Sequence, residues 1–150
     1  SKAQMFEGLI EFIAQTVFAL LNQIVPPGDS APAASADTGV RQAGRVVGVL
    51  LQFAEKNPGM ARVMVGDALV FENERLQQRM NQFFDRVEST LRQCLRAAAQ
   101  SAGSDTPTMD AQVRAAVLTA FVMGRLQRFT RSGFRRVPSE HLDASLALML

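Results

Sequence analysis

Apolar residues recur every three or four positions through most of this chain, and no sustained alternation of apolar and polar residues interrupts them. That spacing places side chains on one face of a helix, whereas a strand requires a period of two. The first such segment follows Ser1, a good helix N-cap, and continues to about Val25, where Pro26 and Pro27 end it. The chain is therefore predicted to be all-α.

The first helix is predicted to carry a core face and a second, smaller apolar patch. Phe12 lies about 120° away from the core face at 100° per residue, near Met5, Thr16 and Ala19. This second patch has no evident use inside the domain. The core face comprises Phe6, Leu9, Ile10, Ile13, Val17, Leu20, Leu21 and Ile24.

Five further helices are predicted, separated by segments that contain Pro, Gly and Ser. Residues 26–37 and 101–108 are predicted to be loops, and the Asn-Pro-Gly sequence at 57–59 a sharp break. Ser139 is expected to cap the last helix. The predicted helices cover residues 38–56, 59–65, 68–99, 109–131 and 139–150.

The composition indicates one globular domain. A chain of 150 residues can bury a core without disulfides or metals. The net charge of +2 is mildly basic, which permits an acidic partner but does not require one. The single cysteine excludes an internal disulfide framework and fits a reducing compartment. No apolar run is expected to span a bilayer, so no membrane partner is predicted.

Residues suited to catalysis are scarce. His141 is the only histidine and has no second ligand at metal-binding spacing near it. Cys94 lies on the apolar stripe of its helix, which favours a buried, inert thiol over a nucleophile. Because no acid–base set, phosphate loop or metal set is evident, the chain is predicted not to be an enzyme and to use no cofactor or metal.

The strongest charge feature is a basic cluster near the end of the fourth long helix. Contact with phosphates is one interpretation. A solvated helix end is favoured over it, because cations suit the helix dipole there and few aromatic residues lie among them. The cluster comprises Arg125, Arg128, Arg131, Arg135 and Arg136.

One face of the fourth long helix consists mostly of small residues, which allow another helix to approach closely. The partner helix could belong to the same chain, or it could be the same helix of a second subunit. The residues alone leave these two possibilities equal. The face comprises Val113, Val117, Ala120 and Gly124, and the neighbouring face carries Leu118, Phe121, Arg125 and Phe129.

A third feature joins Phe12 to a polar stripe on the second helix. Arg45, Val49, Gln52 and Lys56 step by four, three and four, so they share a face. If the two helices pack side by side, an apolar anchor lies beside two cations, which suits an extended peptide with apolar and acidic residues. A stray exposed phenylalanine also explains the pattern, and the residues alone favour that interpretation.

Several sequence blocks resemble TetR-type regulators, and most specifically the nucleoid occlusion factors among them. The opening Ser-Lys pair, followed by Met-Phe, is similar to the junction at which the regulatory domain begins after the helix-turn-helix. Other matching blocks keep their order and approximate spacing over most of the chain. They are residues 9–13, 55–59, 66–72, 75–77, 91–93 and 128–132.

The resemblance implies an all-α homodimer whose last two long helices form a four-helix interface. It therefore favours a second subunit as the partner of the small-residue face. The expected dimer interface comprises Val113, Val117, Ala120, Phe121, Gly124, Leu142 and Leu146.

The resemblance also implies a cell-division inhibitor that is cytoplasmic and associated with the nucleoid. Such factors capture the C-terminal tail of the division protein FtsZ between the first two helices of the regulatory domain, and antagonise Z-ring assembly over the nucleoid. Lys56 replaces an arginine of the family pattern, and Leu20 stands where that pattern has another arginine. Phe12 and Asn57 match the pattern, whereas Val49 and Gln52 depart from it. The expected tail-binding residues are Phe12, Arg45, Val49, Gln52, Lys56 and Asn57.

Two further expectations follow from the resemblance. Regulators of this kind bind chromosomal DNA through an N-terminal helix-turn-helix domain, which is expected to be absent before Ser1, so these 150 residues are not expected to bind an operator. The alternative function is that of a ligand-sensing domain in a TetR-type repressor. That function requires an apolar cavity between the first three long helices.

Overall fold

The helical prediction is confirmed in a computed structural model of the chain, which describes residues 1–27, 35–69, 72 and 74–150. Within these ranges the regular elements are all helices and include no strand. They are α1 (Lys2–Ile24), α2 (Ala36–Lys56), α3 (Pro58–Met64), the 3₁₀ helix η1 (Asp67–Leu69), α4 (Glu74–Ser101), α5 (Pro107–Arg131) and α6 (Leu142–Met149).

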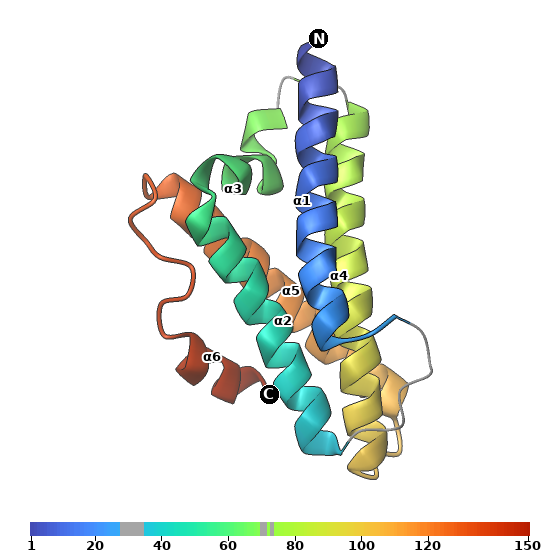
Figure 1. Cartoon of the computed structure of the whole chain (residues 1–150). Coiled ribbons are helices and arrows are strands. Elements are labelled where there is room, and N and C mark those ends of the chain that lie inside the picture. Colours follow the sequence, from blue (N-terminus) through green and yellow to red (C-terminus); the bar gives the residue numbers. More distant parts are fainter. Residues whose placement is uncertain (28–34, 70–71, 73) are drawn as a thin grey trace.

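The long helices form a bundle in which α1 and α4 lie side by side, and α2 and α5 run diagonally to them (Figure 1). The most extensive packing joins α4 to α5, and the next joins α2 to α4. The short α3 contacts α1, α2 and α5. The C-terminal helix α6 lies at the outer side of α2 (Figure 1). This arrangement leaves a face of α2 between α1 and α6.

The helix ends follow from local sequence. Ser1 and Gln4 form a reciprocal capping box at the start of α1, in which the backbone amide of Gln4 donates to the Ser1 hydroxyl at 3.3 Å. Ser35 caps α2 by accepting a bond from the Thr38 amide. Pro58 occupies the first turn of α3, where its missing amide hydrogen leaves no bond unmade.

Two predicted boundaries are wrong. The third long helix was expected to begin near Ala68, but Ala68 belongs to η1 and the α-helix begins at Glu74. Residues 70, 71 and 73 of the predicted helix lie outside the described residues, as do residues 28–34 of the predicted loop at 26–37.

The last helix was expected to begin at Ser139 but begins at Leu142. The Ser139 amide donates instead to the Glu55 carboxylate of α2, at 2.7 Å.

The core is built from apolar side chains of the long helices, including the predicted core face of α1. Ile13 and Val17 of α1, Leu50 and Leu51 of α2, and Leu91 of α4 have no exposed surface. These side chains belong to one core cluster to which α1, α2 and α4 all contribute. Two members of the predicted core face of α1 are less buried, since Leu9 is half-buried and Leu20 is 42% exposed.

Helix α1 is also long and apolar enough to span a membrane by composition, with 23 residues and a mean hydropathy of 1.3 in its most apolar window. The prediction that no run could do so is therefore wrong as a statement about sequence. The fold accounts for part of this apolar content, because seven residues of α1 are buried against the other helices, while 33% of that window is buried overall. They are Phe6, Ile10, Ile13, Val17, Phe18, Leu21 and Ile24.

Candidate functional site

The second apolar patch of α1 lies at the surface. Phe12 is 49% exposed. Phe18, on the opposite flank of the buried stripe, packs edge-on against Phe83 of α4 with ring centroids 5.4 Å apart, and the Arg86 guanidinium lies 3.8 Å above it. Phe12 is about 120° from Phe18 around the helix at 100° per residue. It therefore lies on the flank of α1 away from α4, as do the exposed Met5 and Leu20.

The polar stripe of α2 lies at the surface beside α1. Arg45, Gln52 and Lys56 are exposed, whereas Val49 is half-buried and packs against the core. Gln42 lies two turns before Val49 on the same side of α2, and its amide nitrogen donates to the Ile24 carbonyl at the end of α1, at 3.1 Å. This bond places the end of α1 against the side of α2 on which Val49 lies.

Asn57 lies at the end of the stripe, between α2 and α3. Its backbone is the N-cap of α3, but its side chain makes no capping bond there. The side-chain amide donates instead to the Phe53 carbonyl at 2.9 Å, which closes the last turn of α2. Asn57 therefore fixes the end of the helix that carries Lys56.

One face of α5 is apolar and exposed. Val113 is 55% exposed and Val117 48%. A methyl group added at Gly124 would meet no atom within 4 Å. Among the residues that the structure describes, no other helix covers this surface, hereafter the α5 face. It comprises Met109, Val113, Val117, Ala120, Met123 and Gly124.

The flank of the α5 face is hollowed. A concavity of about 340 Å³ lies between α3, α4 and α5. Ala120, Met123 and Gly124 form its α5 side, and Phe84 and Met64 lie opposite. Phe121, the remaining predicted interface residue of α5, is half-buried beneath the Arg125 guanidinium, which lies 4.7 Å from its ring. The α5 face thus offers both small residues and a recess to an incoming side chain.

The two predicted interface residues of α6 pack within the chain. A methyl group built on Gly44 of α2 would lie 3.5 Å from a Leu146 methyl, and one on Gly48 would lie 3.8 Å from a Leu142 methyl. Leu142 and Leu146 therefore rest over two glycines of α2. Both leucines remain half-exposed.

Comparison with known proteins gives the family. Residues 37–150 match the family described as SlmA-like, tetracyclin repressor-like, C-terminal domain. The chain is 43% identical over 149 residues to the nucleoid occlusion factor SlmA of Vibrio atlanticus, and equally so to that of Vibrio cholerae. It is 38% identical to SlmA of Idiomarina loihiensis. Each match covers 99% of this chain and 71% of the relative. The chain belongs to the SlmA family of nucleoid occlusion factors.

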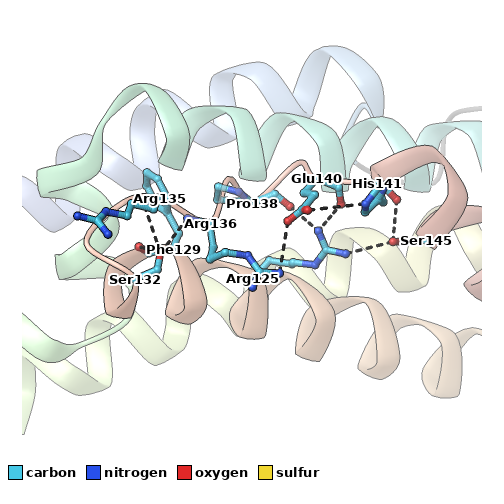
Figure 2. Close-up of polar contacts among 9 residues, drawn as sticks. All are labelled: Arg125, Phe129, Ser132, Arg135, Arg136, Pro138, Glu140, His141 and Ser145. Atoms are coloured by element: carbon cyan, nitrogen blue, oxygen red, sulfur yellow. Dashed lines mark hydrogen bonds and ion pairs between the residues drawn. The ribbon is translucent and has the colours of Figure 1, made fainter.

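The basic cluster at the end of α5 and just after it has two parts in this structure. Arg128, Arg131, Arg135 and Arg136 are exposed, as expected for a solvated helix end. Arg125 is half-buried and holds the C-terminal segment (Figure 2). Its guanidinium donates to the Pro138 carbonyl at 3.1 Å, to the Glu140 carbonyl and to the Ser145 hydroxyl at 3.2 Å.

The residues considered for catalysis have ordinary places in this SlmA-type domain. Cys94 is buried, as predicted; its thiol donates to the Leu91 carbonyl at 3.3 Å, and burial raises its pKa to about 12. The neutral thiol cannot act as a nucleophile near neutral pH. His141 is exposed, with its ring nitrogen 3.7 Å from Glu140. Within the described ranges, no three of the His, Cys, Asp and Glu side chains cluster as metal ligands do.

Two residues of the α5 face were not predicted from the sequence. Met109 and Met123 extend the α5 face, and their spacing of four and three from Val113 and Ala120 was a readable signal. The role of Arg125 gave no such signal. Its bonds reach residues 13 to 20 positions later through an irregular segment, which no helical period describes.

Proposed function

We propose that this chain is the dimerisation and partner-binding part of a nucleoid occlusion factor, and that α1 and α2 bind the C-terminal tail of FtsZ. The observation that motivates the proposal is that Phe12 on α1 is half-exposed and that the cationic face of the neighbouring helix α2 is also exposed. Family membership supports it, because the relatives are nucleoid occlusion factors. In the cell, such binding antagonises Z-ring assembly over the nucleoid.

The residues of the two helices have distinct roles in this proposal. Phe12 is an apolar anchor whose exposed ring surface is buried when the peptide binds. Arg45 and Lys56 supply positive charge at the two ends of the stripe, which attracts an acidic peptide and fixes its direction. Val49 provides an apolar floor, and Gln52 and Asn57 offer hydrogen bonds to an extended backbone. The exposed Leu20 enlarges the apolar surface where the family pattern has a charge.

The proposed protein is a non-enzymatic homodimer that acts in the cytoplasm, at the nucleoid. The α5 face supports the dimer, because a contiguous apolar surface on a helix is typical of an interface. Leu142 and Leu146 extend the proposed interface only through the parts of their side chains that α2 leaves exposed. Chromosomal DNA is assigned to a helix-turn-helix domain outside these 150 residues.

The test is a fluorescence titration of the chain with a labelled FtsZ C-terminal tail peptide. Phe12→Ala is expected to weaken binding by about 10- to 30-fold, because it removes the anchor. Lys56→Asp is expected to weaken it by about tenfold or more, because it replaces an attraction with a repulsion. The Lys56→Asp loss should shrink at high salt, since the charges are exposed.

Two matched controls separate the proposed binding surface from general surface effects. Leu148→Ala removes an apolar side chain that is 90% exposed on α6, and Arg135→Asp reverses a charge beyond the end of α5. Both should bind the peptide as the parent chain does. A dimeric, folded chain that binds no peptide, or that loses nothing through Phe12→Ala, would contradict the proposal.

A further inference from the structure

The segment after α5 crosses the outer side of α2 and is held there by contacts at both of its ends. This C-terminal strap, residues 137–150, begins where the Ser139 amide donates to the Glu55 carboxylate at 2.7 Å. It ends in α6, whose Leu142 and Leu146 lie over Gly48 and Gly44 of α2.

Arg125 is the residue that shapes the strap. Figure 2 shows its guanidinium directed away from α5 into the strap, between the Pro138 and Glu140 carbonyls and the Ser145 hydroxyl. The Ser145 hydroxyl in turn donates to the His141 carbonyl at 2.8 Å. Hydrogen bonds from a charged group are stronger than neutral ones, and an arginine fork also fixes their directions. Arg125 thus connects the irregular part of the strap to the first turn of α6.

The strap contacts α2 next to the residues proposed to bind the tail. Gly44 precedes Arg45, Gly48 precedes Val49, and Glu55 precedes Lys56. At 100° per residue, the three strap-facing positions fall within about 40° of one another, and the binding stripe lies about 90° further round the helix. Arg45 also borders an open hollow of about 500 Å³ at the edge of the contact between α2 and α6, which Gly44, Leu142 and Leu146 line as well. The strap therefore flanks the binding stripe on the side opposite α1.

The middle of α2 needs such support because of its sequence. Glycine in a helix interior lowers helix stability, since its backbone loses more freedom on folding than that of any other residue. Gly44 and Gly48 place two such weak positions one turn apart, directly under α6. Leu142 and Leu146 lie over these two positions, where they can restrict the backbone that carries Arg45 and Val49.

We propose that the C-terminal strap positions the binding face of α2, and that Arg125 is the positioning residue that holds the strap. The inference rests on the proposed function, because the face it stabilises is the one assigned to the FtsZ tail. Arg125 touches no part of that face itself, so it acts through the strap and through α2.

The test compares Arg125→Gln with Arg135→Gln. Both changes remove one positive charge, but Arg135 is exposed and contributes only its backbone amide to a bond within the turn after α5, with the Ser132 hydroxyl. Arg125→Gln is expected to weaken tail-peptide binding by about fivefold, and to speed amide hydrogen exchange in the middle of α2 by about tenfold. Arg135→Gln should change neither quantity.

A rescue separates positioning from a merely structural role. Alanine fits at both Gly44 and Gly48 without displacing the leucines, because the added methyl groups lie at ordinary contact distances of 3.5 and 3.8 Å. Gly44→Ala with Gly48→Ala stiffens α2 directly. Added to Arg125→Gln, the pair should restore the peptide affinity to within about twofold of the parent, while the strap amides stay exchange-labile.

The outcomes are distinct. Unchanged affinity in Arg125→Gln, with the strap released by exchange, would overturn the inference and leave the proposed function standing. Weakened affinity without rescue would overturn the route through α2. If the parent chain itself binds no peptide, the proposed function fails, and the positioning of a tail site fails with it. In that case, unchanged amide hydrogen exchange in α2 of Arg125→Gln would also refute the proposal that the strap stabilises that helix.

Discussion

Replacing Ala120 with aspartate is expected to convert a dimer of this chain into monomers. Ala120 is exposed on the α5 face, between Val117 and Gly124 and beside the recess that Phe84 lines. Two-fold symmetry places the new carboxylate in the interface twice. Each unpaired charge taken out of water costs several kcal/mol, so the dissociation constant should rise by about 10²- to 10⁴-fold.

Sedimentation equilibrium at micromolar concentration measures this effect directly. The parent chain should sediment at twice its monomer mass of 16.4 kDa, whereas the Ala120→Asp chain should sediment at about the monomer mass. Ala19→Asp makes the same chemical change at an exposed position of α1 and should remain dimeric. A dimer that survives Ala120→Asp would move the interface away from the α5 face.

The predictable part of the fold is the part governed by helical periodicity. The face of α1 that the apolar spacing marks as internal is the one that the structure buries, with Leu20 the clearest exception, whereas the apolar face predicted on α5 is exposed. Leu20 shows what helical periodicity alone does not predict. A periodic position at the edge of a stripe is buried only if a neighbouring helix reaches it, and periodicity contains no information about neighbours.

The unpredicted part depends on contacts between distant residues. Ser139 has the chemistry of a helix cap, yet its amide bonds to Glu55, 84 positions earlier, and the helix begins three residues later. Arg125 has the sequence context of a solvated helix end, yet its guanidinium organises the strap. For Arg125, contacts with distant residues outweigh the local preference of a cation for a solvated helix end, which is worth about 1 kcal/mol.

The candidate site divides in the same way. The spacing of Arg45, Val49, Gln52 and Lys56 predicts one shared face of α2, and in the structure three of the four are exposed while Val49 packs partly against the core. The proposed partner is a property that the family resemblance implies and that helical spacing could not supply. The glycines of α2 were visible in the sequence, but their use as the seat of α6 required knowledge of where the strap lies.

Replacing Gly39 with alanine is expected to destabilise the fold more than any other single methyl addition in α2. Here α2 crosses α4 at close range. A methyl group on Gly39 would lie 2.5 Å from the Cys94 carbonyl oxygen and 2.7 Å from the Ala98 methyl. The first of these atoms is backbone, so no side-chain rotation can relieve the clash. Helix α2 must shift away from α4, where it makes one of the largest contacts of the fold.

The expected loss is about 2–3 kcal/mol, because overpacking of this kind exceeds the gain of about 1 kcal/mol in helix propensity. For a domain of this size the Tm should fall by about 5–10 °C, measured by circular dichroism at the helical minimum. Gly8→Ala is the matched control. Gly8 is exposed on α1 with no atom within 4 Å of an added methyl, so the same change should raise the Tm by about 2 °C. A Gly39→Ala chain at least as stable as the parent would show that α2 and α4 lie further apart than the structure has them.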